Sequence, residues 1–288
     1  MQKNQRAYFG ALLAMWFLFA CLLPIQAFSV VNPAFRLTRY GETTPEKIRI
    51  FYMNNHANQT FGFTADKKNQ YLPPRHLKMS IWDAMKLVET LVDDSSAQPS
   101  SSLSSHYFQT AEALRKDGHP RWLILTGLIY DLGKVLAFYG EPPWAIQGDT
   151  YPVGCPFSNK IVFSSYFKFN SDQHVDEYQK PHGIYAPNLG LDQVSMAWGQ
   201  DEYLYHVLKK YLPEQSAYII RYRSFYAYHR EGAYQYLLDD KDWEMLPLLQ
   251  LFVQYETCAR KSIPIDIEKL RAYYEGLVQE FFPAAIDW

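Results

Sequence analysis

The sequence predicts a mainly α-helical protein with a single domain and long irregular loops. Apolar residues recur at helical spacing over several segments, and no alternating pattern is long enough to build a sheet of any size. Residues 140–188, between two groups of these segments, are rich in glycine, proline and aromatic residues, which indicates irregular structure. With 288 residues, of which 48% are hydrophobic, the chain is long enough to bury a substantial core.

The first element in the chain is an apolar segment near the N-terminus. Lys3 and Arg6 precede an apolar stretch over residues 7–23, and Ala27 follows it closely. A charged start, an apolar centre and a small residue at the end are typical of a secretory signal peptide, here residues 1–27, with the domain over 28–288. A membrane anchor or a lipid anchor on Cys21 are alternatives. All three predict an exported protein, which is periplasmic, secreted or membrane-anchored.

The remaining elements are predicted helices and the loops between them. Ser80 is expected to cap one helix, because a serine hydroxyl accepts a backbone N–H in the first turn. The Ser-rich residues 93–105 are expected to form a loop. Helices are expected over residues 45–63, 81–92, 106–116, 122–139, 191–211, 214–228, 243–259 and 267–282.

Charge and cysteine content exclude some classes of function. The formal net charge is −2, and no concentrated basic stripe is visible, so a nucleic-acid partner is not expected. The three cysteines cannot form a disulfide framework, and no CxxC pair indicates structural zinc. Aromatic residues reach 17%, which fits a well-packed core or a pocket with many hydroxyl-tipped walls.

Asp131 and Lys134 are the first candidates for chemistry. Three residues apart, they lie on one helical face, and Gly133 between them allows another element to approach closely. Such a pair is usually solvated, but here the flanking residues are apolar nearly all round, which predicts a buried helix. A buried Asp and Lys need partners. Taken singly, His106 and Glu256 read as ordinary surface residues.

Several longer motifs resemble the myo-inositol oxygenase family of the HD-domain superfamily. They occur in the family's order and include HYFQTAE at 106–112, DLGKVLA at 131–137, GEPPWAIQGDTYPVGC at 140–155, WGQDEY at 198–203 and SFY at 224–226. The resemblance implies an HD-domain-like helical domain. It also implies a non-haem di-iron centre, held by four histidines and two aspartates, that uses O2 to cleave myo-inositol to D-glucuronate.

Three of the six metal-ligand positions carry other residues in this sequence. His106 and Asp131 match the family, and Glu256 stands where the family has an aspartate. The other three positions, histidines in the family, are Tyr130, Gln200 and Arg223. The iron expected from the family is therefore reduced here to at most one metal ion, held by His106, Asp131 and Glu256 with the Tyr130 phenol as a further ligand, or to none.

Arg223 is expected to replace the second iron electrostatically. A guanidinium stays protonated and cannot ligate a metal. The charges of Asp131 and Glu256 against Arg223 and Lys134 sum to zero, so the pocket can be neutral without a metal. In an alternative alignment another histidine, such as His206 or His229, substitutes for a lost ligand.

The family positions that orient the polyol are better retained in this sequence than the metal-ligand positions. The resemblance also implies that Lys134 is the catalytic lysine. The resemblance implies substrate contacts from Asp93, Lys134, Gly148, Asp149, Ser224 and an N-terminal arginine, which is Arg36 or Arg39. Two functions follow: a polyol-binding pseudoenzyme or weakly active member, or else an active inositol oxygenase or a mononuclear-metal oxygenase or hydrolase. A scaffold for a protein partner is a third. The expected partner is a small polyol such as myo-inositol, and the expected state is a monomer.

Overall fold

The computed structural model describes residues 44–91, 103–259 and 265–288. The predicted signal peptide, Arg36, Arg39 and Asp93 lie outside the described residues. From Thr43 onward the chain is one compact unit. It is mainly α-helical, as the sequence predicts.

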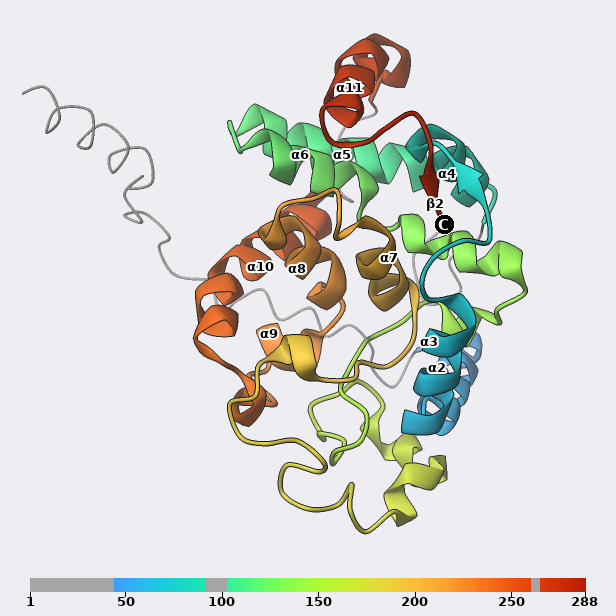
Figure 1. Ribbon diagram of the computed structural model, residues 1–288, viewed down its shortest axis with the longest axis vertical. Coiled ribbons are helices and arrows are strands. Elements are labelled where there is room, and N and C mark those ends of the chain that lie inside the picture. The colour runs from blue at the N-terminus through green and yellow to red at the C-terminus, as the bar shows by residue number, and fades with distance from the viewer. Residues whose placement is uncertain (1–43, 92–102, 260–264) are drawn as a thin grey trace, which may run out of the picture. The chain divides into compact units, whose positions relative to one another are not determined.

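Two helix pairs form the centre of this unit (Figure 1). Helix α5 (Leu103–Lys116) packs against α6 (Arg121–Ile129), and α7 (Gln200–Leu208) packs against α8 (Glu214–Tyr222). Helix α10 (Asp240–Ala259) contacts both α5 and α8 and so joins the two pairs.

The other elements surround these pairs. The remaining α-helices are α2 (Glu46–Asn58), α3 (Phe61–Tyr71), α4 (Ile81–Val88), α9 (Tyr226–His229) and α11 (Ile267–Phe281). The 3-10 helices are η1 (Leu132–Tyr139), η2 (Pro143–Ala145), η3 (Ser164–Phe169), η4 (Ser171–His174), η5 (Leu191–Gln193) and η6 (Gln235–Leu237). Strands β1 (Lys78–Met79) and β2 (Ile286–Asp287) pair antiparallel, with Lys78 opposite Asp287.

Several predicted helices are interrupted in the structure. The segment expected as one helix over 122–139 is α-helical only to Ile129 and continues as the 3-10 helix η1, with Asp131 outside the helical region at φ −108°, ψ 4°. The segment 214–228 divides into α8 and α9 after Arg223. Both interruptions fall at the candidate site residues, where the backbone departs from regular helix.

Two further predicted helices have different bounds. The segment 45–63 contains the end of α2 and the start of α3, because the Thr60 hydroxyl accepts the Phe63 N–H at 3.0 Å and caps a new helix. The segment 191–211 is α-helical only over α7, because Gly199 before it is fully extended.

The predicted cap and the predicted buried helix are confirmed. The Ser80 hydroxyl accepts the Asp83 N–H at 3.1 Å at the start of α4. Residues 123–129 of α6 are all buried. In the described part of the chain, Arg121–Tyr139 is the one helical stretch long and apolar enough to cross a membrane, but 78% of its apolar window is buried in the core. It is a core element here.

The aromatic residues contribute heavily to the core. Apolar side chains form two buried clusters, one around α5, α6 and α11 and one around the irregular segment and α8. Trp288 at the C-terminus is completely buried, and its indole N–H donates to the Met79 carbonyl at 3.2 Å. The two central helix pairs are thereby enclosed by packed side chains, and polar groups between them lie away from bulk water.

Candidate functional site

Arg223 is the centre of a buried charge cluster between the helix pairs. It caps the C-terminal end of α8 and is 4% exposed. Its guanidinium contacts three carboxylates: Nη2 lies 2.5 Å from Asp131 Oδ1 and 2.8 Å from Asp201 Oδ1, and Nη1 lies 3.1 Å from Glu256 Oε1. The carboxylates come from the start of η1, the first turn of α7 and α10. One cation therefore connects four elements.

Lys134 is the second cation of the cluster. Its ammonium nitrogen Nζ lies 2.6 Å from Asp131 Oδ2, and both residues are buried. The predicted pair is thus present, and Arg223 contacts the other carboxylate oxygen of Asp131. Burial alone would raise the pKa of Asp131, but the charges of Lys134 and Arg223 hold that pKa well below its usual range. Asp131 is therefore ionised at neutral pH.

Tyr130 lies under the Arg223 guanidinium. The guanidinium carbon is 4.7 Å from the centre of the phenol ring, which is the geometry of a cation–π contact. His106 meets the same ring edge-on, with the ring centroids 6.1 Å apart. His106 and Arg223 therefore both contact the Tyr130 ring.

Asp201 belongs to the cluster, and the sequence reasoning missed it. The signal that could have found it is its place directly after Gln200 in the same motif. The pKa of Asp201 is raised to about 6, mainly because the carboxyl group is buried. The negative charges of Asp131 and Glu256 also raise this pKa, whereas Arg223 and a hydrogen bond from Ser224 lower it. With Asp201 ionised, three carboxylates face two cations, so the neutral sum predicted from four residues does not hold.

The described side chains do not fit a di-iron centre. Among them no group of three or more His, Cys, Asp and Glu residues is arranged to hold a metal ion. Both oxygens of Asp131 contact cations, and Glu256 Oε1 contacts Arg223. A guanidinium cannot ligate, so a metal would have to displace a buried, three-fold paired arginine.

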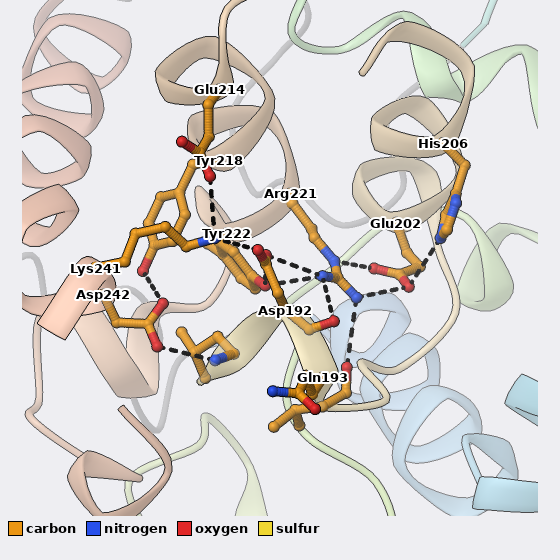
Figure 2. A network of polar contacts seen from close by, with 12 residues as sticks. Asp192, Gln193, Glu202, His206, Glu214, Tyr218, Arg221, Tyr222, Lys241 and Asp242 are labelled. Carbon is orange, nitrogen blue, oxygen red and sulfur yellow. Dashed lines mark hydrogen bonds and ion pairs between the residues drawn. The ribbon is translucent and has the colours of Figure 1, made fainter. Parts of the chain in front are cut away.

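Figure 2 shows a second buried ion pair, between Arg221 and Glu202. Arg221 Nε lies 2.7 Å from Glu202 Oε2, and Lys68 Nζ lies 2.9 Å from Glu202 Oε1. Burial alone would raise the pKa of Glu202, but Arg221, His206 and Lys68 hold that pKa well below its usual range. Asp201 and Glu202 on α7 thus pair with Arg223 and Arg221 on α8.

The histidines considered as substitute ligands have other contacts. His206 Nε2 lies 3.4 Å from Glu202 Oε1, in the second network. His229 Nε2 lies 2.9 Å from the Arg223 carbonyl oxygen, which accepts its N–H. The structure thus places both in contact with neighbours of the cluster.

The predicted polyol positions Gly148, Asp149 and Ser224 lie near the cluster. Gly148 has φ +102°, a backbone conformation that favours glycine, and a Cβ there would lie 3.1 Å from Phe51 Cε1, so the Phe51 ring would have to shift. Asp149 Oδ1 accepts the Tyr52 hydroxyl at 3.0 Å. The Ser224 carbonyl accepts the Thr150 N–H at 3.1 Å, which fixes the loop of Asp149 to the end of α8.

A small cavity adjoins these residues. Its wall includes Gly148, Asp149, Gln200 and Asp201. The space is about 10 Å³, room for one water-sized group. The cavity brings two predicted polyol positions and one substituted metal position to one place.

Comparison with known proteins gives one consistent result. The family model described as myo-inositol oxygenase matches residues 45–288. The chain is 38% identical to "Inositol oxygenase" of Dictyostelium discoideum over 260 residues, covering 87% of this chain and 89% of the relative. It is 41% identical to "Inositol oxygenase" of Danio rerio (83% and 89% covered) and 39% identical to "Inositol oxygenase 2" of Arabidopsis thaliana (88% and 83% covered).

Proposed function

The chain belongs to the myo-inositol oxygenase family, and we propose that it binds a small polyol such as myo-inositol without carrying out the family's di-iron oxidation. The observation that carries the proposal is the position of Arg223, whose guanidinium contacts three buried carboxylates. A permanent positive charge thus stands among the acids that would otherwise hold metal.

The polyol-binding part of the proposal is supported by the retained positions. Gly148 keeps the left-handed backbone that brings the chain close to Phe51, and Asp149 is held by the Tyr52 hydroxyl. Lys134 and Ser224 lie at the cluster itself. Carboxylate, ammonium and hydroxyl groups are the partners that a compound with several hydroxyls requires.

The loss of oxidation follows from the donor set. Bound iron would supply the redox chemistry with O2. In this chain, three of the family's iron-ligand positions carry Tyr130, Gln200 and Arg223 in place of histidine. Asp131 and Glu256 are already paired with Arg223. A buried ion pair is strongly destabilised when one partner is removed, so metal entry would cost several kcal/mol.

A mononuclear metal site is the second candidate. His106, Asp131 and Glu256 remain, and an imidazole with two carboxylates is a ligand set that suits Fe, Mn or Zn. Its geometry requires both carboxylates to release Arg223. The alternative to a polyol-binding protein without di-iron chemistry is therefore an oxygenase or hydrolase that binds one metal ion at this half-site of His106, Asp131 and Glu256.

Metal content and ligand binding measured together test the proposal. We expect the full chain, purified with and without air, to contain less than one iron per chain, to bind myo-inositol by calorimetry and to form no glucuronate. Gly148→Val should abolish binding, whereas Gly276→Ala, at a position on α11 with open space around it, should leave binding unchanged. Two irons per chain with glucuronate formation would overturn the proposal, and one metal per chain with turnover would favour the half-site enzyme.

A further inference from the structure

Two glutamine side-chain oxygens at the small cavity have no hydrogen-bond partner among the described residues. Gln147 and Gln200 both line it and are 9% and 7% exposed. In the described part of the chain, Oε1 of each is buried without a partner. An unsatisfied buried acceptor destabilises the protein, so a group that donates hydrogen bonds to both oxygens would be favoured there.

The backbone holds these two residues in place before any ligand binds. Gln147 N donates to the Pro143 carbonyl at 3.0 Å, and Gln200 N donates to the Ile146 carbonyl at 2.8 Å. The loop that carries Gln147 is therefore fixed directly to the start of α7. Both side chains are also buried, so their amide oxygens lose less conformational entropy on binding than exposed ones would.

The charge beside the cavity favours a cation. Asp201, which lines the cavity, contacts Arg223 together with Asp131 and Glu256, and Lys134 is the second cation. Three carboxylates against two cations leave a negative charge. A carboxylate or phosphate on a ligand would be repelled, and a positively charged donor would balance the cluster.

The size of the cavity limits what can enter. About 10 Å³ takes one water-sized group, which is a hydroxyl or an ammonium and not a whole ring. A hydroxyl donates one hydrogen bond, whereas an ammonium donates three. Two glutamine oxygens and the Asp201 carboxylate therefore match an ammonium better.

We propose that this cavity receives the ammonium group of an amino-polyol, an aminocyclitol or amino sugar, with Gln147 and Gln200 as acceptors and Asp201 as counter-ion. The inference rests on the proposed polyol site and names its ligand class.

Matched ligand pairs test this inference by calorimetry on the full chain. Scyllo-inosamine is compared with scyllo-inositol, whose ring positions are all equivalent, so the place of the amine on the ring does not matter. Glucosamine and glucose form a second pair, and myo-inositol 1-phosphate is the anionic probe. We expect the amine of each pair to bind about tenfold more tightly or better, and the phosphate to bind most weakly. Equal affinities within both pairs, or tighter binding of the phosphate, would overturn the inference.

Variants separate this inference from the proposed function. Gln147→Met and Gln200→Met remove the acceptor at nearly constant volume, and each should weaken amine binding about tenfold while leaving the thermal midpoint unchanged or higher. Asp201→Asn should remove the preference for the amine. If the wild type binds polyols but shows no preference and no loss in the Met variants, this inference alone fails. If it binds neither amine nor neutral polyol, the proposed function fails as well.

Discussion

Gly133 at the start of η1 lies directly against Gln200 at the start of α7. A Cβ built on Gly133 would come within 2.0 Å of the Gln200 carbonyl oxygen. This close approach of two backbones brings Asp131 and Lys134 to the same place as Asp201, so one glycine determines whether the charge cluster can assemble.

Gly133→Ala should therefore destabilise the protein severely. The clash is with backbone, which cannot rotate away, and overpacking of this kind costs about 3 kcal/mol or more. The free energy of unfolding from urea titration measures the loss. Gly276→Ala is the matched control, because a Cβ at this position of helix α11 would point into open space, and it should stabilise by about 0.5–1 kcal/mol. Equal effects of the two substitutions would contradict the close approach.

Arg223→Met should be far more destabilising than an ordinary loss of a surface charge. It would leave Asp131, Asp201 and Glu256 buried without their shared cation, and breaking a buried pair costs about 3–5 kcal/mol. Arg223→Lys keeps the charge without the planar fork and should lose less. Urea unfolding of both variants measures the difference.

The control for Arg223 is Arg271→Met on the surface of α11. Arg271 pairs with Glu275 at 2.8 Å in full solvent, where such pairs contribute little. Its removal should leave the unfolding free energy unchanged within error. If Arg223→Met were equally mild, Arg223 would not be the cation that holds the cluster together.

The sequence predicted most of the fold because the main elements follow local rules. The apolar periodicity and the Ser80 cap predicted α4, and the nearly continuous apolar residues of α6 predicted its burial, which the structure confirms. The helix interruptions at Asp131 and after Arg223 could not be predicted in the same way. They depend on contacts between distant segments, such as Gly133 with Gln200.

The candidate site was predictable only in part for the same reason. The pairs of Arg223 with Asp131 and Glu256 follow from the expectation that Arg223 stands among the acids, and the structure places them in contact. Asp201 carries no pattern of its own, because an acid in the first turn of a helix is usually solvated. Its burial, and so its raised pKa, arises from the packing of α7 against α8.

Asp201 should make stability depend on pH. Its pKa is raised to about 6 from the usual 3.8, so the folded state binds the proton more tightly than the unfolded state. The stability from this group is fully present below about pH 4 and is lost as the pH rises through about 6. Above that pH, the ionised carboxylate costs roughly 2–3 kcal/mol relative to the neutral acid.

Asp201→Asn removes this titration and so isolates it. Asparagine resembles the neutral acid, so the variant should gain stability relative to the wild type between about pH 4 and pH 7. Titrating groups far from Asp201 are present in both proteins and cancel in the difference. Urea unfolding of both proteins at about pH 4 and about pH 7 measures the difference in their free energies of unfolding. A difference that is the same at the two pH values would show that Asp201 is ionised throughout this range.

Restoring the three histidines should restore iron binding if Arg223 has replaced a metal. Tyr130→His, Gln200→His and Arg223→His together give four histidines with Asp131 and Glu256, and they remove the cation from the metal position. We expect iron uptake per chain to rise in metal analysis, with Fe(III) absorption as a second readout. The double variant that keeps Arg223 is the control, and it should take up less iron because the guanidinium still neutralises the carboxylates. A triple variant that unfolds cooperatively but takes up no more iron than the double variant would show that these positions do not converge on a metal site.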